Sequence, residues 1–151
     1  MKASIRDYME SERELRTFLN ESGLSEDSEI MAVEQKAFDA SQAFTQTRKN
    51  HPQLKELYAV NDALKGDMID AKLKGDEETY QAKMSEYTSL RMQLEKTSKN
   101  LPEIQAAQAE LQVVLDEQNE LIARKVEAVN SDGKKIAKRY RELHEQFKNK
   151  R

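Results

Sequence analysis

The apolar residues of this chain recur three and four positions apart over most of its length, and this spacing constrains the fold more than any other feature. Residues spaced in this way fall on one narrow side of an α-helix, as they do in coiled coils. The chain has only four glycines and two prolines in 151 residues, so little interrupts such helices. The pattern predicts an all-α protein: an antiparallel bundle of long helices, or long helical hairpins, with coiled-coil-like seams.

Polar breaks divide the chain into six predicted helices. The first spans residues 4–20 and the second about 26–49, with Gly23 as a stop and Ser25 or Ser28 as a cap between them. The third and fifth helices follow the two prolines, the fourth follows the turn LKGDEET with Gly75 as stop and Asp76 as cap, and the last follows a break at 130–133. We expect three segments: an N-terminal amphipathic helix at 1–24, a helical core domain at 25–130, and a basic amphipathic C-terminal helix at 131–151.

Both prolines lie in copies of the motif T-x-K-N-x-P, which begins at Thr47 and again fifty residues later. Asparagine is a good N-cap, and Gln53 or Glu103 follows it by three residues, as in a capping box. The sequences diverge soon after the motifs, which argues against a duplicated domain. Each copy is predicted to end one helix and start the next, with Asn50 and Asn100 as the N-caps.

Two of the apolar stripes are predicted to form interaction seams. Their narrow shape does not readily supply the wide core that a monomer needs, so self-association would help to bury them. The seam residues lie on the second and fifth predicted helices: Ile30, Val33, Ala37, Ala40, Phe44, Leu111, Val114 and Leu121. We therefore expect a homo-oligomer and protein partners. The sequence leaves open whether the seams are buried within one chain or between chains.

The residue types that enzymes and metal sites need are sparse or badly spaced in this chain. It has no cysteine, which excludes disulfides, thiolate metal sites and a thiol nucleophile. Neither His51 nor His144 has a glutamate three residues before it, as a di-iron bundle requires, and no glycine-rich phosphate loop occurs. No window approaches the ~18 apolar residues of a membrane span. We expect a cytoplasmic protein without cofactor, metal or enzymatic activity.

The C-terminal segment is the most basic part of a chain whose net charge is −3. Residues 134–151 contain eight basic and two acidic side chains. An amphipathic helix with basic flanks can bind nucleic acid, an anionic membrane or an acidic protein surface. The candidate contacts to such an anion are Lys134, Lys135, Lys138, Arg139 and Arg141. The alternative is that the helix packs its apolar face on the acidic remainder of the chain: Ile136, Tyr140, Leu143 and Phe147.

Several stretches share a pattern of helix lengths and corners with a known family. They are the corner TRKNHPQLKEL, the glycine-containing turn LKGDEET and the long helix PEIQAAQAELQVVLDEQNELI. Over about residues 28–129 the chain resembles the YlbF/YmcA family of small helical bacterial proteins. The resemblance implies a cytoplasmic, non-enzymatic regulator that works as a subunit of protein complexes, some of them linked to RNA processing. Some members of that family bear cysteines tied to iron–sulfur binding; this chain has none, so the resemblance implies no cofactor here.

Three functions remain open from the sequence. The leading hypothesis is a helical interaction or adaptor protein that presents its seams to partners. The second is nucleic-acid binding, to RNA in particular, through the basic C-terminal helix. The third is a chaperone-like structural protein, to which three methionines give slight support because such side chains adapt to varied surfaces: Met68, Met84 and Met92.

Overall fold

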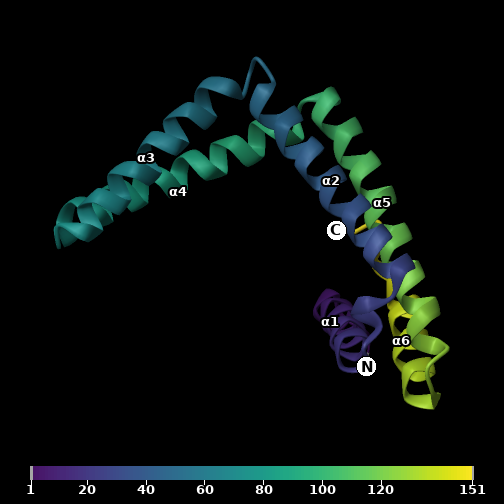
Figure 1. Cartoon of the computed structure of the whole chain (residues 1–151). Helices are drawn as coiled ribbons and strands as arrows, with labels where there is room; N and C mark the ends of the chain where they lie inside the picture. The colour runs from purple at the N-terminus through teal and green to yellow at the C-terminus, as the bar shows by residue number, and fades with distance from the viewer. Residues whose placement is uncertain (1, 151) are drawn as a thin grey trace. The chain divides into compact units, whose positions relative to one another are not determined.

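Helices make up most of the chain, as the apolar spacing predicts (Figure 1). The computed structural model describes residues 2–150, which form a short 3-10 turn, η1 (Leu24–Glu26), and six α-helices: α1 (Ile5–Glu21), α2 (Ser28–Asn50), α3 (Lys55–Leu73), α4 (Glu77–Lys99), α5 (Pro102–Glu127) and α6 (Ser131–Phe147). This part of the chain contains no strand. The prediction of an all-α helical bundle is confirmed.

The helices form two compact units, which are described separately. The terminal unit comprises residues 1–39 and 112–151, and so contains α1, α6 and the adjoining parts of α2 and α5. The central unit, residues 40–111, contains α3, α4 and the remaining parts of α2 and α5. These boundaries differ from the three segments expected from the sequence, because the first and last helices pack on each other.

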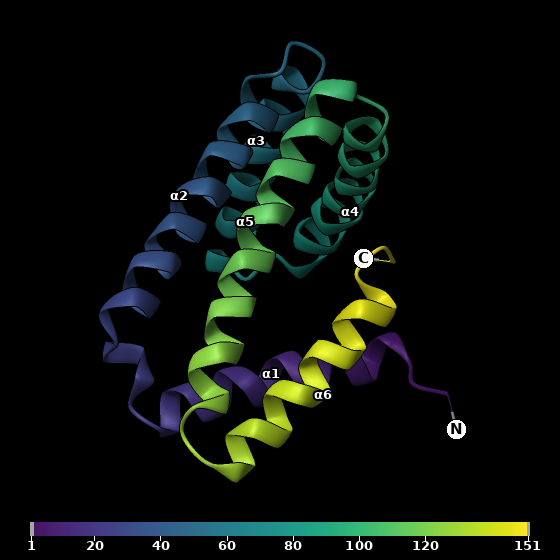
Figure 2. The ribbon, with the colours of Figure 1, turned by 90° about the vertical axis from the view of Figure 1, so that its right-hand side faces the viewer.

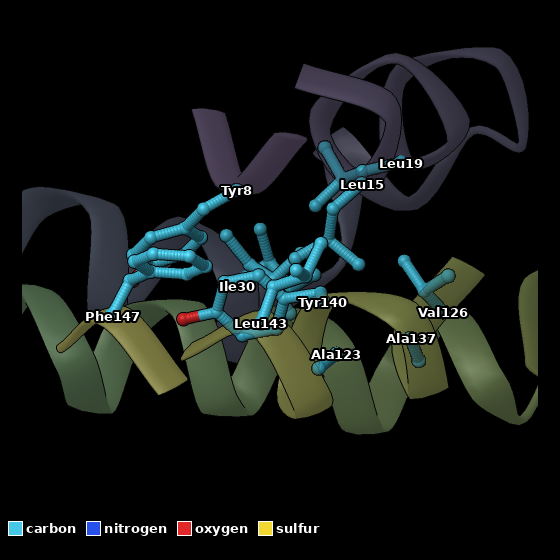
Figure 3. Packing of buried hydrophobic residues seen from close by; sticks show 11 residues of the cluster. Tyr8, Leu15, Leu19, Ile30, Ala123, Val126, Ala137, Tyr140, Leu143 and Phe147 are labelled. Atoms are coloured by element: carbon cyan, nitrogen blue, oxygen red, sulfur yellow. The ribbon is translucent and has the colours of Figure 1, made fainter. Parts of the chain in front are cut away.

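The core of the terminal unit lies where α1 and α6 pack side by side (Figure 2). Their apolar faces meet residues of α2 and α5 in one buried cluster (Figure 3): Tyr8, Leu15, Leu19, Ile30, Ile122, Ala123, Val126, Ala137, Tyr140, Leu143 and Phe147. The ring of Tyr8 stacks on that of Phe147, with centroids 6.3 Å apart. Because apolar burial is the dominant favourable term in folding, this cluster is the main source of stability for the unit.

The C-terminal helix packs through the face that the sequence predicts. Tyr140, Leu143 and Phe147 are buried in the terminal core, and Ile136 is half-buried beside them. The apolar side of the basic segment is therefore used inside the chain. This is the packing alternative that the sequence leaves open.

A different residue from the one predicted caps α2. Gly23 adopts the left-handed conformation, at φ +77°, directly after the C-cap of α1, and so ends that helix as expected. However, the carboxylate of Asp27 accepts the backbone N–H groups of Glu29 at 2.9 Å and Ile30 at 3.1 Å. The predicted caps Ser25 and Ser28 were wrong, because Asp27 is the residue directly before the first helical position.

Gly133 does not break the chain as predicted, but lies inside the first turn of α6. Asn130 is the N-cap, and its side-chain oxygen accepts the backbone N–H of Gly133 at 2.9 Å. A Cβ on Gly133 would overlap the backbone carbonyl oxygen of Val126 and lie 3.1 Å from the ring of Phe18. Glycine is therefore required here by the close approach of α6 to its neighbours.

In the central unit, neither asparagine of the T-x-K-N-x-P copies is an N-cap. α2 continues through Asn50, and the backbone N–H of Gln53 donates to Nδ1 of His51 at 3.2 Å in the turn before α3. Asn100 is the C-cap of α4, and α5 begins at Pro102. The predicted capping boxes were wrong at both corners. A proline disfavours helical geometry only at the residue directly before it, so the preceding helix can extend up to the asparagine.

The two proline corners meet in the central unit. A small buried cluster joins them: Leu54, Leu94, Leu101 and Ile104. Around it, Nε2 of His51 lies 3.5 Å from a carboxylate oxygen of Glu103, and Arg48 lies 3.1 Å from a carboxylate oxygen of Glu95. The two motif copies, far apart in sequence, are thus parts of one structural junction.

α3 and α4 form an antiparallel hairpin (Figure 1). Gly75, at φ +70°, adopts the left-handed conformation that favours glycine, and the carboxylate of Asp76 accepts the backbone N–H of Thr79 at 3.1 Å. Both assignments agree with the sequence prediction for this turn. Along the hairpin, Asn61 and Leu64 of α3 are buried.

Candidate interaction surface

The two histidines make structural contacts. His51 lies in the junction of the proline corners, where Glu103 faces it. Nδ1 of His144 is 2.7 Å from the hydroxyl oxygen of Tyr8, and its ring stacks on that of Tyr140 with centroids 5.5 Å apart. Within the described chain, no group of three or more histidine and acidic side chains is arranged to hold a metal ion. In the same residues, no helix combines the length and the apolar character needed to cross a membrane.

The predicted seam residues make contacts within the chain. Ile30 is fully buried in the terminal core, and Ala37 is only 5% exposed. Phe44 packs against the leucine cluster of the proline corners. The half-buried members, which keep some exposed surface, are Val33, Ala40, Phe44, Leu111, Val114 and Leu121. The seams are therefore partly used in folding and offer only part of their surface to a second molecule.

A shallow hollow of about 680 Å³ in the terminal unit borders two seam residues, Val33 and Leu121. Several carboxylates line it, but basic side chains neutralise two of them. Glu117 pairs with Lys36 at 3.1 Å, and Glu120 pairs with Arg141 at 3.0 Å. These ion pairs connect helices of the unit, so the carboxylates have a structural use.

Two of the five basic residues predicted to contact an anion form ion pairs inside the terminal unit. Arg139 lies 2.9 Å from a carboxylate oxygen of Glu14, which ties α6 to α1. Arg141 pairs with both Glu120 and Glu127, which ties α6 to α5. The other three are exposed: Lys134, Lys135 and Lys138. Part of the positive charge of the tail is thus neutralised by its own unit.

The pair between Arg141 and Glu127 makes stability depend on pH. Hydrogen bonding from Arg141 lowers the pKa of Glu127, and the same hydrogen bond raises the pKa of Arg141. A carboxyl group whose pKa is lower in the folded state adds stability above its unfolded pKa. That contribution is lost as the pH falls through the lowered folded-state pKa of Glu127.

We expect the substitution Glu127→Gln to lower the free energy of unfolding at neutral pH by up to about 1 kcal/mol, because the pair is partly exposed and screened by solvent. Urea unfolding should show this deficit shrinking as the pH falls through the lowered folded-state pKa of Glu127, because the native carboxylate then also becomes protonated. The matched control is Glu145→Gln, because Glu145 is 72% exposed and its partner Lys148 is the C-cap of the same helix. A deficit that stays constant with pH would contradict an electrostatic origin.

An apolar groove lies between α3 and α4, and we call it the hairpin groove. It has a volume of about 440 Å³, and six side chains form most of its wall: Met68, Ile69, Leu73, Tyr80, Met84 and Tyr87. Ile69 is 60% exposed and Leu73 is 81% exposed. Contiguous apolar surface that stays open to solvent commonly marks a site of interaction.

The charged side chains of this wall, among the described residues, are two lysines. Lys65 and Lys72 both come from α3. Nζ of Lys72 lies over the ring of Tyr80, 5.0 Å from its centroid, in a cation–π contact. The hairpin groove therefore combines an apolar surface with positive charge and carries no carboxylate in its described wall.

The sequence identifies part of this groove. The three- and four-residue apolar spacing of the predicted third and fourth helices includes Met68, Tyr80, Met84 and Tyr87. Ile69 and Leu73 fall outside this spacing. These two residues lie four positions apart: Ile69 directly follows the stripe residue Met68, and Leu73 comes two residues after the stripe residue Ala71. A second apolar pair at helical spacing is the signal that could have shown a wider apolar face.

Comparisons with models of known families, with characterised proteins and with solved structures find no match to this chain. They therefore do not bear on the resemblance to the YlbF/YmcA family, which stays a prediction. An assignment of function must rest on the surfaces of the molecule, and the hairpin groove is an apolar surface whose residues Ile69 and Leu73 stay exposed to solvent.

Proposed function

We propose that this chain is a non-enzymatic helical interaction protein that acts through protein–protein contacts in a complex, as the resemblance to YlbF-type regulators implies. The observation that carries the proposal is the exposure of Ile69 and Leu73 in an apolar groove. Burying a large apolar side chain contributes roughly 1.5–3 kcal/mol. Two such residues, with the neighbouring apolar wall, would give a partner a substantial share of its binding energy.

The proposal includes a cytoplasmic location and a homo-oligomer. A chain without cysteine fits a reducing compartment. Six of the eight seam residues are only half-buried, so a second copy could cover them further. Size-exclusion chromatography with light scattering should give a dimeric or larger mass at micromolar concentrations. A monomeric mass throughout that range would contradict self-association.

Site-specific photo-crosslinking tests the contact with partners. A photoreactive amino acid at Leu73, in the hairpin groove, should give adducts with other proteins when the chain is expressed in cells. The control position is Met92, which is 70% exposed on α4 and lies outside the groove wall. Adducts at Leu73 and not at Met92 are the expected result. Equal labelling at both positions, or none at Leu73, would contradict a role for the groove in protein–protein contacts.

A further inference from the structure

We propose that the hairpin groove binds an amphipathic α-helix of a partner protein, one whose apolar stripe is flanked by carboxylates. This inference rests on the proposed function and names the chemistry of the partner. The groove lies between two antiparallel helices, and a third helix can place the side chains of its apolar stripe between the two rows. Such a helix would complete a three-helix layer around residues that the chain leaves exposed.

The dimensions of the hairpin groove suit a short length of helix. Its α3 wall runs from Lys65 to Leu73, which corresponds to about 12 Å at a rise of ~1.5 Å per residue. Its α4 wall runs from Tyr80 to Tyr87, over a similar length. A partner helix would therefore contact it over about two turns, through apolar residues at positions i, i+3, i+4 and i+7.

The side chains of the wall also suit a helical ligand. Met68 and Met84 are flexible and polarizable, so they can adapt to the apolar residues of a partner. Tyr80 and Tyr87 offer large apolar surface with a polar end. Leu73 is the most exposed large apolar residue in the described part of the chain, so a partner helix can bury most of its side chain.

Charge decides which kind of helix fits. Lys65 and Lys72 are the charged groups of the described groove wall. Glutamate or aspartate beside the apolar stripe of a partner would meet these ammonium groups, whereas lysine or arginine in those positions would be repelled. Complementary charge in this arrangement selects the partner and its orientation more than it adds raw affinity.

The same charges disfavour a second copy of the chain in this groove. In a two-fold symmetric contact the same patch faces itself. The lysines of one wall, Lys65 and Lys72, would then approach those of the other, and the described wall supplies no carboxylate to separate them. A different protein with acidic flanks is the better complement, while the seams stay available for self-association.

Two synthetic peptides provide the test, with the full-length protein as receptor. Each has about 20 residues, because shorter helices are marginal in water. Both carry leucines at helical spacing, and they differ only in having glutamates or lysines beside this stripe. Fluorescence anisotropy should show the acidic peptide binding at least about tenfold more tightly at low salt. This preference should diminish as salt is added.

Substitutions in the groove sharpen the test. Leu73→Asp should weaken binding of the acidic peptide at least about tenfold, because it places a charge in the apolar contact. The double substitution Lys65→Glu and Lys72→Glu should reverse the preference toward the basic peptide. The matched control, Met92→Asp, should bind like the native chain. Because Leu73 and Met92 are 81% and 70% exposed, neither change should prevent folding, which circular dichroism can verify.

Several results would overturn the inference. Equal binding of both peptides would do so, and so would binding that survives Leu73→Asp. If Leu73→Asp instead reduces the mass measured by light scattering to that of the monomer, the groove would be assigned to a second copy of the chain. Binding of phosphatidylserine-containing vesicles through Leu73, without peptide binding, would assign it to a membrane surface. Photo-crosslinks at Leu73 in cells combined with failure of the acidic peptide would reject the acidic helix and leave the proposed function standing. Peptide binding without crosslinks at Leu73 in cells would contradict the proposed function, and with it a natural partner helix in this groove.

Discussion

Replacing Gly133 with alanine is expected to destabilise the terminal unit by about 2–3 kcal/mol. A Cβ at this position would overlap the backbone carbonyl oxygen of Val126 and press on the ring of Phe18. A backbone carbonyl cannot rotate away as the end of a flexible side chain can. The start of α6 must therefore move against α5 and α1, which loosens the core that these helices share.

Gly66 supplies the matched control for this substitution. It lies inside α3, and a Cβ built on it meets nothing within 4 Å. Alanine at Gly66 should therefore stabilise the protein by about 0.5–1 kcal/mol, because glycine loses more conformational freedom when a helix forms. The same chemical change thus has opposite expected signs at two helical glycines of one chain.

Hydrogen exchange read by mass spectrometry, together with urea unfolding, measures both effects. Gly133→Ala should speed exchange in α1 and α6 and leave the hairpin of α3 and α4 unchanged, because the two units have separate buried clusters. Exchange in α6 as slow as in the native chain would show that the α5–α6 corner tolerates the methyl group. The close approach at Gly133 would then have no energetic importance.

The helices could be predicted from the sequence because their apolar residues repeat with the helical period. The expected helix at 4–20 is α1, Ile5–Glu21, and the expected helix at 26–49 is α2, Ser28–Asn50. The turn at Gly75 was also predictable, since a left-handed glycine followed by an acidic N-cap is determined by adjacent residues. Signals that act within one turn of helix are readable without the tertiary structure.

The remaining caps could not be chosen from local preference, because several residues compete within a single turn. Ser25, Asp27 and Ser28 can all cap a helix. Ile30 is buried in the terminal core, and its backbone N–H donates to the carboxylate of Asp27. A helix that begins where Ile30 can be buried is therefore capped by Asp27. At the first proline corner, a side chain with weak capping preference, His51, receives the backbone N–H that a capping box would have satisfied. Tertiary packing decides among these local possibilities.

The candidate surfaces depend even more on contacts between distant residues. Composition identifies a basic C-terminal segment, but it does not show that Arg139 faces Glu14 or that Arg141 faces Glu120. Likewise, the apolar stripe of α3 is visible in the sequence, whereas the exposure of Leu73 is not. Which side of a helix stays uncovered is determined by the fold. The sequence could therefore indicate a wide apolar face on α3, but only the structure shows that this face stays open as a groove.

The second large effect is expected at the junction of the proline corners. Leu94→Ala should destabilise the central unit by about 2–4 kcal/mol. Leu94 is 1% exposed and contacts a small cluster in which Leu54 and Ile104 are also almost fully buried. The prolines restrict the backbone on both sides, so the corners have little freedom to close the cavity that the lost side chain would leave.

The control for Leu94→Ala is Met92→Ala on the same helix, where the side chain is 70% exposed. Urea unfolding should place the free energy of unfolding of that variant within about 0.5 kcal/mol of that of the native chain.

Hydrogen exchange of the Leu94→Ala variant then separates two explanations of the repeated T-x-K-N-x-P motif. If each corner is held by its own residues, Leu94→Ala should leave protection after both prolines nearly unchanged. If the shared cluster holds them, one substitution on α4 should speed exchange at the starts of α3 and α5 together, although these lie almost fifty residues apart in the sequence. We expect faster exchange at both corners, because Leu54 of the first corner and Leu101 and Ile104 of the second belong to the same buried cluster as Leu94.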